Sequence, residues 1–137
     1  MEKKIFRIQR KIDRLYAKLE IELMTKRTMQ NLGFPMQEKG CVYIIVATKL
    51  AMQQPEFLLQ MPLLYAEIAQ MYEIIKEEVE GEITKVIRHW WQKERLLRLN
   101  GKKNADYDFY RESIPTNQEC LEKLIRIVSQ ERTKNRQ

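Results

Sequence analysis

Residues that break helices are rare in this chain, and the intervals between them are long. The 137 residues include only four glycines and four prolines. Within the intervals, apolar residues recur at steps of three and four, the period of an amphipathic α-helix rather than of a strand. The sequence therefore predicts an all-α fold, a single helical domain of about six helices. At this length, one domain with its own hydrophobic core is expected.

The first predicted helix is basic and carries an apolar seam. The members of this seam alternate steps of three and four, as in a heptad repeat: Ile5, Ile8, Ile12, Leu15 and Leu19. Residues 1–27 hold nine Lys or Arg against four Asp or Glu, and the helix is predicted to reach roughly Lys26. Residues 1–28 form a predicted unit of their own. Two partners fit the seam equally well: a second copy of the chain, which makes its five residues dimerisation candidates, or the domain's own core.

The other predicted helices lie in residues 29–132. A break at residues 32–35 precedes a buried helix from Gly40 to about Gln53, and a short helix follows Pro55. The next helix, residues 63–72, starts after Pro62, which suits a first helical turn. It is predicted to bury apolar and aromatic residues, namely Leu64, Tyr65, Ile68, Ala69 and Tyr72.

A long helix is predicted from about Lys76 to residue 100. Its apolar stripe consists of Val79, Ile83, Val86, Ile87 and Trp90, with Leu97 further along. Polar residues 102–113 follow, held to the core by Tyr107, Phe109 and Tyr110. The last helix begins at Thr116 or Asn117 as N-cap, with Glu119 in its first turn. The chain is predicted to fray from Glu131, leaving residues 133–137 as a tail.

The helix at residues 63–72 and the long helix after it match a helix-turn-helix arrangement. Such a pair needs a small residue where the two helices cross, and Ala69 is placed for this. It also needs an apolar residue early in the second helix, and Val79 supplies one. Any helical hairpin can show the same spacing, so this pattern alone is a weak indication.

Three short segments resemble landmarks of one family. They are residues 39–44 (KGCVYI), 64–69 (LYAEIA) and 115–117 (PTN). The order and spacing are similar to K-G-Y-x-Y-L, L-Y-P-D-I-A and P-T-N in the C-terminal effector domain of the stage-zero sporulation response regulator. The resemblance covers roughly residues 29–132. It implies a bacterial, cytoplasmic, all-helical DNA-binding transcription regulator that reads double-stranded DNA with the second helix of its motif and pairs head-to-tail on tandem boxes.

The chain departs from this family in two places. No receiver domain is expected, because residues 1–28 are too short to form one, so the resemblance does not imply activation by phosphorylation. The family's Ser-Arg-Val-Glu-Arg run, whose arginines reach base edges, aligns without a gap to residues 77–81 (EEVEG). A competing register with four inserted residues aligns it to residues 81–85 (GEITK). The ungapped register is preferred because Trp91 also matches, but in both registers the first family Arg is Glu.

The candidate DNA-binding residues lie on the exposed side of the long helix. They are Lys76, Glu77, Glu78, Gly81, Thr84, Lys85 and Arg88, with Lys93, Arg95, Lys102 and Lys103 as candidates for contacts to the DNA backbone. Arg bound to guanine is the commonest specific contact, whereas Glu can only accept a hydrogen bond, for example from cytosine. Glu77, Glu78 and Glu80 also suit the positive end of the helix dipole without any DNA.

The remaining features exclude other classes of function. His89 is the only histidine and has no partner at ligand spacing, so no metal site and no cofactor are predicted. No nucleophile motif, paired carboxylates or phosphate-binding loop indicates an enzyme. The two cysteines, Cys41 and Cys120, are interpreted as reduced thiols of a cytosolic protein, and the longest apolar run, residues 41–47, is too short to cross a membrane.

The leading hypothesis is a stand-alone, sequence-specific regulator that binds double-stranded DNA. The net charge of +6 suits a polyanionic partner. In this reading the basic first helix serves for dimerisation or as a second arm on phosphates. The alternative is a degenerate relative that no longer reads DNA and acts as a protein-interaction or dimerisation module.

Overall fold

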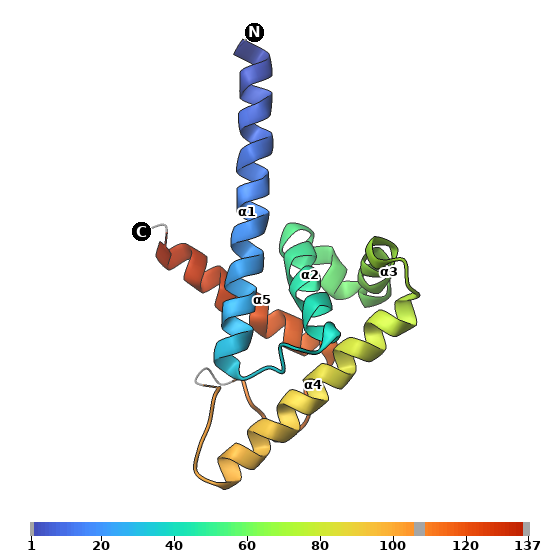
Figure 1. The fold of residues 1–137 in the computed structure, drawn as a ribbon, viewed down its shortest axis with the longest axis vertical. Helices are drawn as coiled ribbons and strands as arrows, with labels where there is room; N and C mark the ends of the chain where they lie inside the picture. Colours follow the sequence, from blue (N-terminus) through green and yellow to red (C-terminus); the bar gives the residue numbers. More distant parts are fainter. Residues whose placement is uncertain (1, 106–108, 136–137) are drawn as a thin grey trace.

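The computed structural model describes residues 2–105 and 109–135, and this part of the chain is helical with no strand (Figure 1). The elements are α1 (Glu2–Leu32), α2 (Lys39–Gln53), the 3-10 helix η1 (Pro55–Leu59), α3 (Met61–Tyr72), α4 (Lys76–Leu99) and α5 (Asn117–Asn135). Five α-helices and one short 3-10 helix confirm the predicted all-α fold. Tyr107 and the last two positions of the predicted tail lie outside the described residues.

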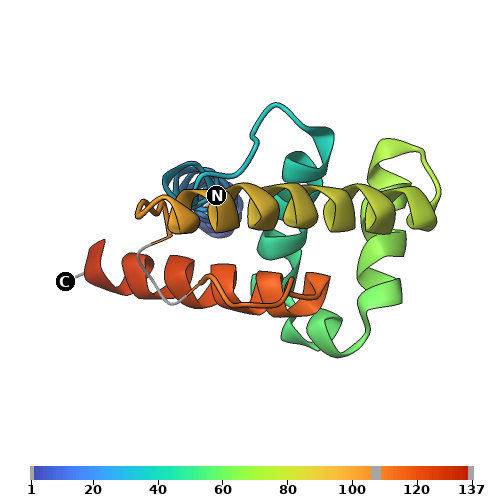
Figure 2. The ribbon, with the colours of Figure 1, turned by 90° about the horizontal axis from the view of Figure 1, so that it is seen from below.

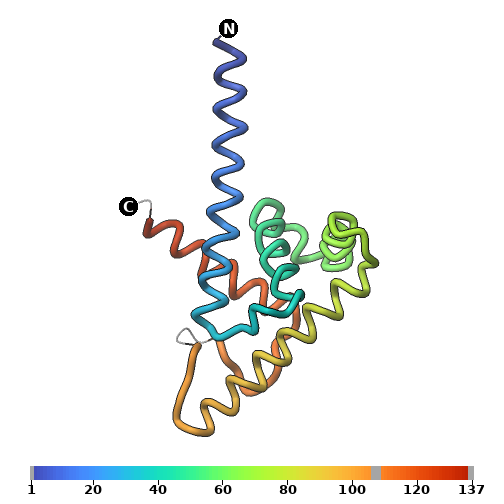
Figure 3. Tube along the Cα trace, viewed as in Figure 1, coloured from blue at the N-terminus to red at the C-terminus, as the bar shows by residue number. Residues whose placement is uncertain are grey.

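Helix α1 is longer than predicted and has two different halves. It continues to Leu32 rather than ending near Lys26, and it runs without interruption through position 28. Its last third packs into the domain, where Met24, Met29 and Leu32 are at most 3% exposed. The rest projects from the domain as a free helix, as the trace in Figure 3 shows. The buried last third accounts for the extra length, because tertiary packing stabilises a helix more than local propensity does.

The apolar seam lies on the projecting part of α1 and does not pack on the domain. Its five residues are 38–61% exposed: Ile5, Ile8, Ile12, Leu15 and Leu19. Two partners were predicted for the seam, and the prediction that it packs on the domain's own core is therefore wrong. The core-facing residues of α1 begin at Ile21, on the opposite side of the helix from Leu19 at 100° per residue.

The core forms where α2, α3, α4 and α5 meet. The predicted stripe of α4 is confirmed, since Val79, Ile83, Val86, Ile87 and Trp90 are each at most 1% exposed. Trp90 stacks on Phe34 with ring centroids 5.1 Å apart and meets the edge of Phe109, also at 5.1 Å. Its indole N–H donates to the carbonyl of Leu32 at 2.8 Å, which ties α4 to the end of α1.

Helix α2 crosses α4 at Gly40, and the crossing leaves no room for a side chain. A Cβ at Gly40 would lie 2.3 Å from the Glu82 carbonyl oxygen and 2.5 Å from Cγ2 of Val86. This close approach explains the glycine of the first landmark. In Figure 2, α1 is seen end-on at one side of the domain and α3 lies at the other, with α4 extending between them.

Two further predictions need correction. Tyr72 is 41% exposed rather than buried, because it lies at the end of α3; its ring meets that of Tyr43 in an edge-to-face contact with centroids 5.3 Å apart. The predicted start of fraying at Glu131 is also too early, since α5 continues to Asn135. Arg132 contacts Glu20 of α1 at 3.8 Å, which holds the last turns of α5 against α1. Phe109 is buried as predicted, and the half-buried Tyr110 stacks on Trp91 at 6.1 Å.

Candidate nucleic-acid interface

Helices α3 and α4 form a helix-turn-helix with a three-residue connection, residues 73–75. Glu73 ends α3 in the left-handed conformation, with φ of 56°, and the amide of Ile74 donates to the Ala69 carbonyl at 3.0 Å. Ala69 is 5% exposed and Val79 is fully buried. The small and apolar positions predicted for the crossing are therefore both buried.

The side of α4 turned away from the core is exposed along its first three turns. We call it the outer face, and its residues line one shallow hollow: Glu77, Glu80, Gly81, Thr84, Lys85 and Arg88. Their spacing of three and four places them on one side of the helix. Five of these six are among the predicted DNA-binding residues; the sixth, Glu80, was interpreted only as a dipole-compatible carboxylate.

Gly81 lies in the middle of the outer face and has open space around it. A Cβ at this position would meet no atom within 4 Å outside the helix's own neighbouring backbone. Glycine in a helix interior costs about 1 kcal/mol relative to alanine. Packing within the described domain gives no reason for this cost, in contrast to Gly40.

One edge of the outer face is formed by the start of α5. The side-chain nitrogen Nδ2 of Asn117 donates to the hydroxyl of Tyr65 at 2.9 Å and to the hydroxyl of Thr84 at 3.0 Å. Thr84 in turn donates to the Glu80 carbonyl at 2.9 Å. Burial raises the pKa of Tyr65, and the bond from Asn117 acts in the opposite direction. The second and third landmarks thus meet in one hydrogen-bond network beside α4.

The position of Asn117 is set by a reciprocal cap at the start of α5. The amide of Glu119 donates to the Thr116 hydroxyl at 3.1 Å, and the amide of Thr116 donates to the Glu119 carboxylate at 3.0 Å. This hydrogen bond from the Thr116 backbone lowers the pKa of Glu119. Of the two N-caps predicted, Thr116 has the capping role. Asn117 is free to face α4, a site role that its P-T-N landmark could have suggested.

Two predicted residues lie off the outer face. Glu78 points toward α2 and forms an ion pair with Lys39 at 3.1 Å, and this hydrogen bond raises the pKa of Lys39. Lys76 is exposed at the first position of α4, beside the outer face rather than on it. The carboxylate of Glu78 is therefore engaged within the domain.

The outer face has a charge gradient along the helix. Glu77 and Glu80 lie toward the start of α4, and Lys85 and Arg88 lie toward the middle, so the four formal charges sum to zero. Lys85 also forms an ion pair with Glu82 at 3.1 Å. Arg88 is exposed and is the cation of this face furthest from Glu77.

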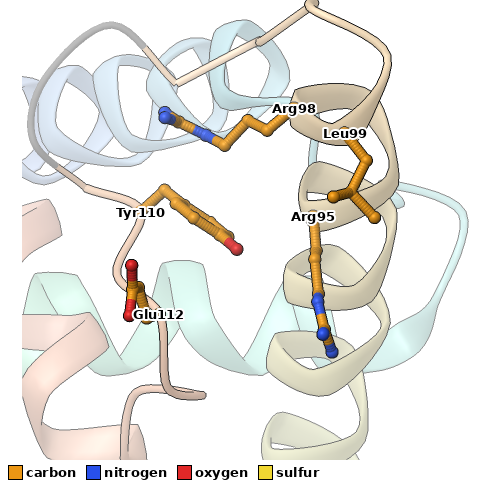
Figure 4. A pocket seen from close by; sticks show the side chains of 5 residues that line it. All are labelled: Arg95, Arg98, Leu99, Tyr110 and Glu112. Atoms are coloured by element: carbon orange, nitrogen blue, oxygen red, sulfur yellow. The ribbon is translucent and has the colours of Figure 1, made fainter.

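The predicted backbone-contacting cations lie further along the chain. Arg95 is placed over the Trp91 ring, 5.5 Å from its centroid. It lines a second hollow with Arg98, Leu99, Tyr110 and Glu112, in which the Arg98 guanidinium covers the Tyr110 ring at 4.4 Å (Figure 4). Lys93 is exposed on α4, and Lys102 and Lys103 are exposed just after it. None of these four residues lines the hollow of the outer face. Arg95 lies seven residues, about 10 Å, beyond Arg88 on the same side of α4, whereas Lys102 and Lys103 follow the end of the helix.

The remaining candidate groups have structural roles. Nδ1 of His89 lies 3.0 Å from the Glu38 carboxylate, which joins α4 to the residue before α2. Cys41 and Cys120 are buried free thiols, and burial raises the pKa of each to about 12. Within residues 2–105 and 109–135, no three His, Cys, Asp or Glu side chains are grouped to hold a metal ion. No helix of the described chain is long and apolar enough to cross a bilayer.

Comparison with known proteins gives one match. A family model described as sporulation initiation factor Spo0A C terminal matches residues 25–128, which is 104 of the 137 residues. The match confirms the resemblance seen in the three landmarks. It begins within α1 and includes α2 to α4 and most of α5. The searches of curated proteins and of solved structures found no match.

Proposed function

Because this chain belongs to the family of Spo0A C-terminal domains, which are DNA-binding regulatory domains and not enzymes, we propose that it is a stand-alone transcription regulator. It binds double-stranded DNA in a sequence-specific manner through the outer face of α4, in the cytoplasm of a bacterium. Lys76 contacts phosphate beside this face. Lys93, Arg95, Lys102 and Lys103 contact the DNA backbone further out.

The observation that carries this proposal is the outer face itself. It begins the second helix of a helix-turn-helix, and in such motifs the first turns of that helix enter the major groove. Gly81 at its centre has no packing role in the described domain. A position without a side chain lets a nucleic acid approach the helix backbone closely, which would account for the glycine. Thr84 and Asn117, fixed by their mutual hydrogen bond, define one edge of the contact surface.

The side chains of the outer face differ in the bases they can recognise. Arg88 presents a planar donor pair that fits the O6 and N7 acceptors of guanine. Glu80 offers only acceptors, which suit the N4 amino group of cytosine. A face with both residues is expected to recognise C·G base pairs on both sides of Gly81, and it has less non-specific affinity than an all-cationic face because Glu77 and Glu80 repel phosphates.

Selection from a random double-stranded DNA pool tests this function. The purified chain is incubated with the pool at two salt concentrations, and the retained DNA is sequenced. Enrichment of a short motif, with affinity falling steeply as salt rises, would support a sequence-specific reader. Retention without any enriched motif would contradict it.

Substitutions on the outer face then locate the contact. Arg88→Ala combined with Lys85→Ala is expected to lower affinity for the selected site by roughly 5- to 150-fold, the range for one lost bidentate base contact. The matched control is Arg126→Ala with Lys134→Ala, which removes the same charge from exposed positions of α5. Equal losses in the two double variants would indicate a charge effect and not a reading face.

A second candidate function is recognition of a protein. The exposed carboxylates of Glu77 and Glu80 favour it, because they place negative charge on the face that the family resemblance assigns to base reading. The double variant Glu77→Gln with Glu80→Gln separates the two functions. For a DNA reader the selected motif changes, since acceptor contacts are altered. For a protein-binding face, the variant gains DNA affinity without gaining any motif, since only repulsion is removed.

A further inference from the structure

The projecting part of α1 exposes an apolar surface that the domain does not cover. Besides the seam, Tyr16 and Leu23 are 68% and 60% exposed and extend the same side of the helix. The domain contacts α1 from the other side, through Ile21, Met24 and Met29. At 100° per residue the middle of the seam and the middle of this buried stripe are roughly opposite. The seam therefore faces away from its own domain and cannot close onto it without breaking α1.

We propose that residues 5–19 of α1 pair in parallel with the same segment of a second copy of this chain. The seam places Ile5, Ile12 and Leu19 at heptad position a and Ile8 and Leu15 at position d. In the central heptad, Ile12 at a and Leu15 at d form the combination that favours two parallel strands, whereas Ile8 at d and Leu19 at a depart from it. Because the domain lies on the opposite side of α1, two copies joined along the seam carry their domains outward without collision.

The orientation of the pair follows from the lysines that flank the seam. Lys4, Lys11 and Lys18 all occupy heptad position g. In an antiparallel pair, g residues of one helix face g residues of the other, so each lysine would meet a lysine. In a parallel pair, g faces e of the partner, which here is Gln9, Tyr16 or Leu23. The aliphatic stems of the lysines can then cover apolar side chains, and like charges are kept apart.

The segment is short, and the domain compensates for this. An isolated helix of this length is marginal in water, because the first turn is costly to form. Here the last third of α1 is buried in the domain, so the helix is already nucleated when two copies meet. The pair is consequently reversible and depends on protein concentration.

A parallel pair has a consequence for the two α4 helices. Its two-fold axis runs along α1, whose N-terminus lies at the end of the molecule remote from α4 (Figure 1). Both α4 helices are therefore placed at the same end of the dimer. A pair of this symmetry presents two identical surfaces to an inverted repeat, unlike the head-to-tail pairing on tandem boxes that the family resemblance implied. The pairing itself does not depend on DNA.

Disulfide trapping tests the pairing and its direction in the full chain. Under mild oxidation, Ile5→Cys is expected to form a covalent dimer with itself, because equal positions are adjacent in a parallel pair. Arg10→Cys, on the outer side of the coil at position f, is the matched control and should remain monomeric. The native thiols need not be removed, since Cys41 and Cys120 are buried.

The alternatives give different results. A 1:1 mixture of Ile5→Cys and Leu15→Cys that yields only the mixed disulfide would indicate an antiparallel pair, in which position a faces position d of the partner, and would overturn the proposed direction. Sedimentation equilibrium of the unmodified chain should show a monomer–dimer equilibrium that Ile12→Lys shifts to monomer by at least tenfold in dissociation constant. A chain that stays monomeric at all accessible concentrations, or that forms trimers, would overturn the proposal. Near-ultraviolet dichroism of the core tryptophans verifies that Ile12→Lys remains folded.

Discussion

The two sides of α4 differ most clearly at two glycines. Gly40 of α2 presses against the inner side, where a Cβ would lie 2.3 Å from the Glu82 carbonyl oxygen. Gly81 lies on the outer side, where a Cβ would meet nothing within 4 Å. Packing thus explains the glycine on the inner side, whereas no contact within the described domain explains the glycine on the outer side. A glycine without an internal reason points to a contact made outside the chain, and substitutions at the two positions should act in opposite directions.

The largest expected effect is at the inner side. Gly40→Ala forces a methyl group against a backbone carbonyl that cannot rotate away, so α2 and α4 must separate. Overpacking of this kind costs about 3 kcal/mol. Denaturant unfolding should show this loss, whereas Val42→Ala, at a 44% exposed position two residues further along α2, should lose less than about 1 kcal/mol. Equal effects would mean that the crossing is looser than the distances indicate.

The next effect concerns the pH dependence of the same interior. Burial raises the pKa of Cys120 from 9.0 to about 12. Between these values the unfolded chain releases the thiol proton and the folded chain retains it, so stability falls as pH rises. The slope from one such thiol approaches about 1.4 kcal/mol per pH unit. The free energy of unfolding, measured from pH 8 to about 11, should fall less steeply with pH for Cys120→Ala than for the unmodified chain. Parallel curves would contradict the prediction.

A smaller effect is expected where the two sides meet, at Asn117. Asn117→Ala removes the donor to Tyr65 and leaves its mostly buried hydroxyl without that partner, at a cost of about 1 kcal/mol. Since this bond opposes the effect of burial, the pKa of Tyr65 should rise further. Tyrosinate absorbance during alkaline titration measures this change. Gln130→Ala, an exposed position on the same helix, should alter neither quantity.

These contrasts also mark what the sequence could and could not predict. Periodicity identified the helices and the buried stripe of α4, because a side chain's place on a helix follows from its number. It could not choose a partner for the seam, since apolar steps of three and four are the same whether the partner is the domain or a second copy. It missed Asn117, whose role depends on Tyr65 and Thr84, residues 52 and 33 positions away. Contacts at such separations depend on how the helices pack.

The helix ends were missed for a related reason. Local signals favoured an end of α1 near Lys26, yet the helix continues because Met29 and Leu32 are buried by helices that come later in the chain. For the DNA-binding candidates, spacing correctly grouped Gly81, Thr84, Lys85 and Arg88 on one exposed side. It could not separate Glu78 from them, because its ion-pair partner Lys39 belongs to another helix.

The smallest expected effect, and the one with the opposite sign, is at Gly81. Gly81→Ala adds a methyl group in open space and removes the conformational freedom of glycine from the unfolded chain, so the domain should become more stable by about 0.5–1 kcal/mol. Gly101→Ala is the matched control, because Gly101 is equally open but has φ of +75°, a conformation that strains alanine and should cost about 1 kcal/mol. If DNA approaches α4 as proposed, Gly81→Ala will lower affinity for the selected site although it stabilises the fold, whereas Gly101→Ala will leave affinity unchanged. A stabilised Gly81→Ala domain with full affinity would show that the outer face is not approached closely by its ligand.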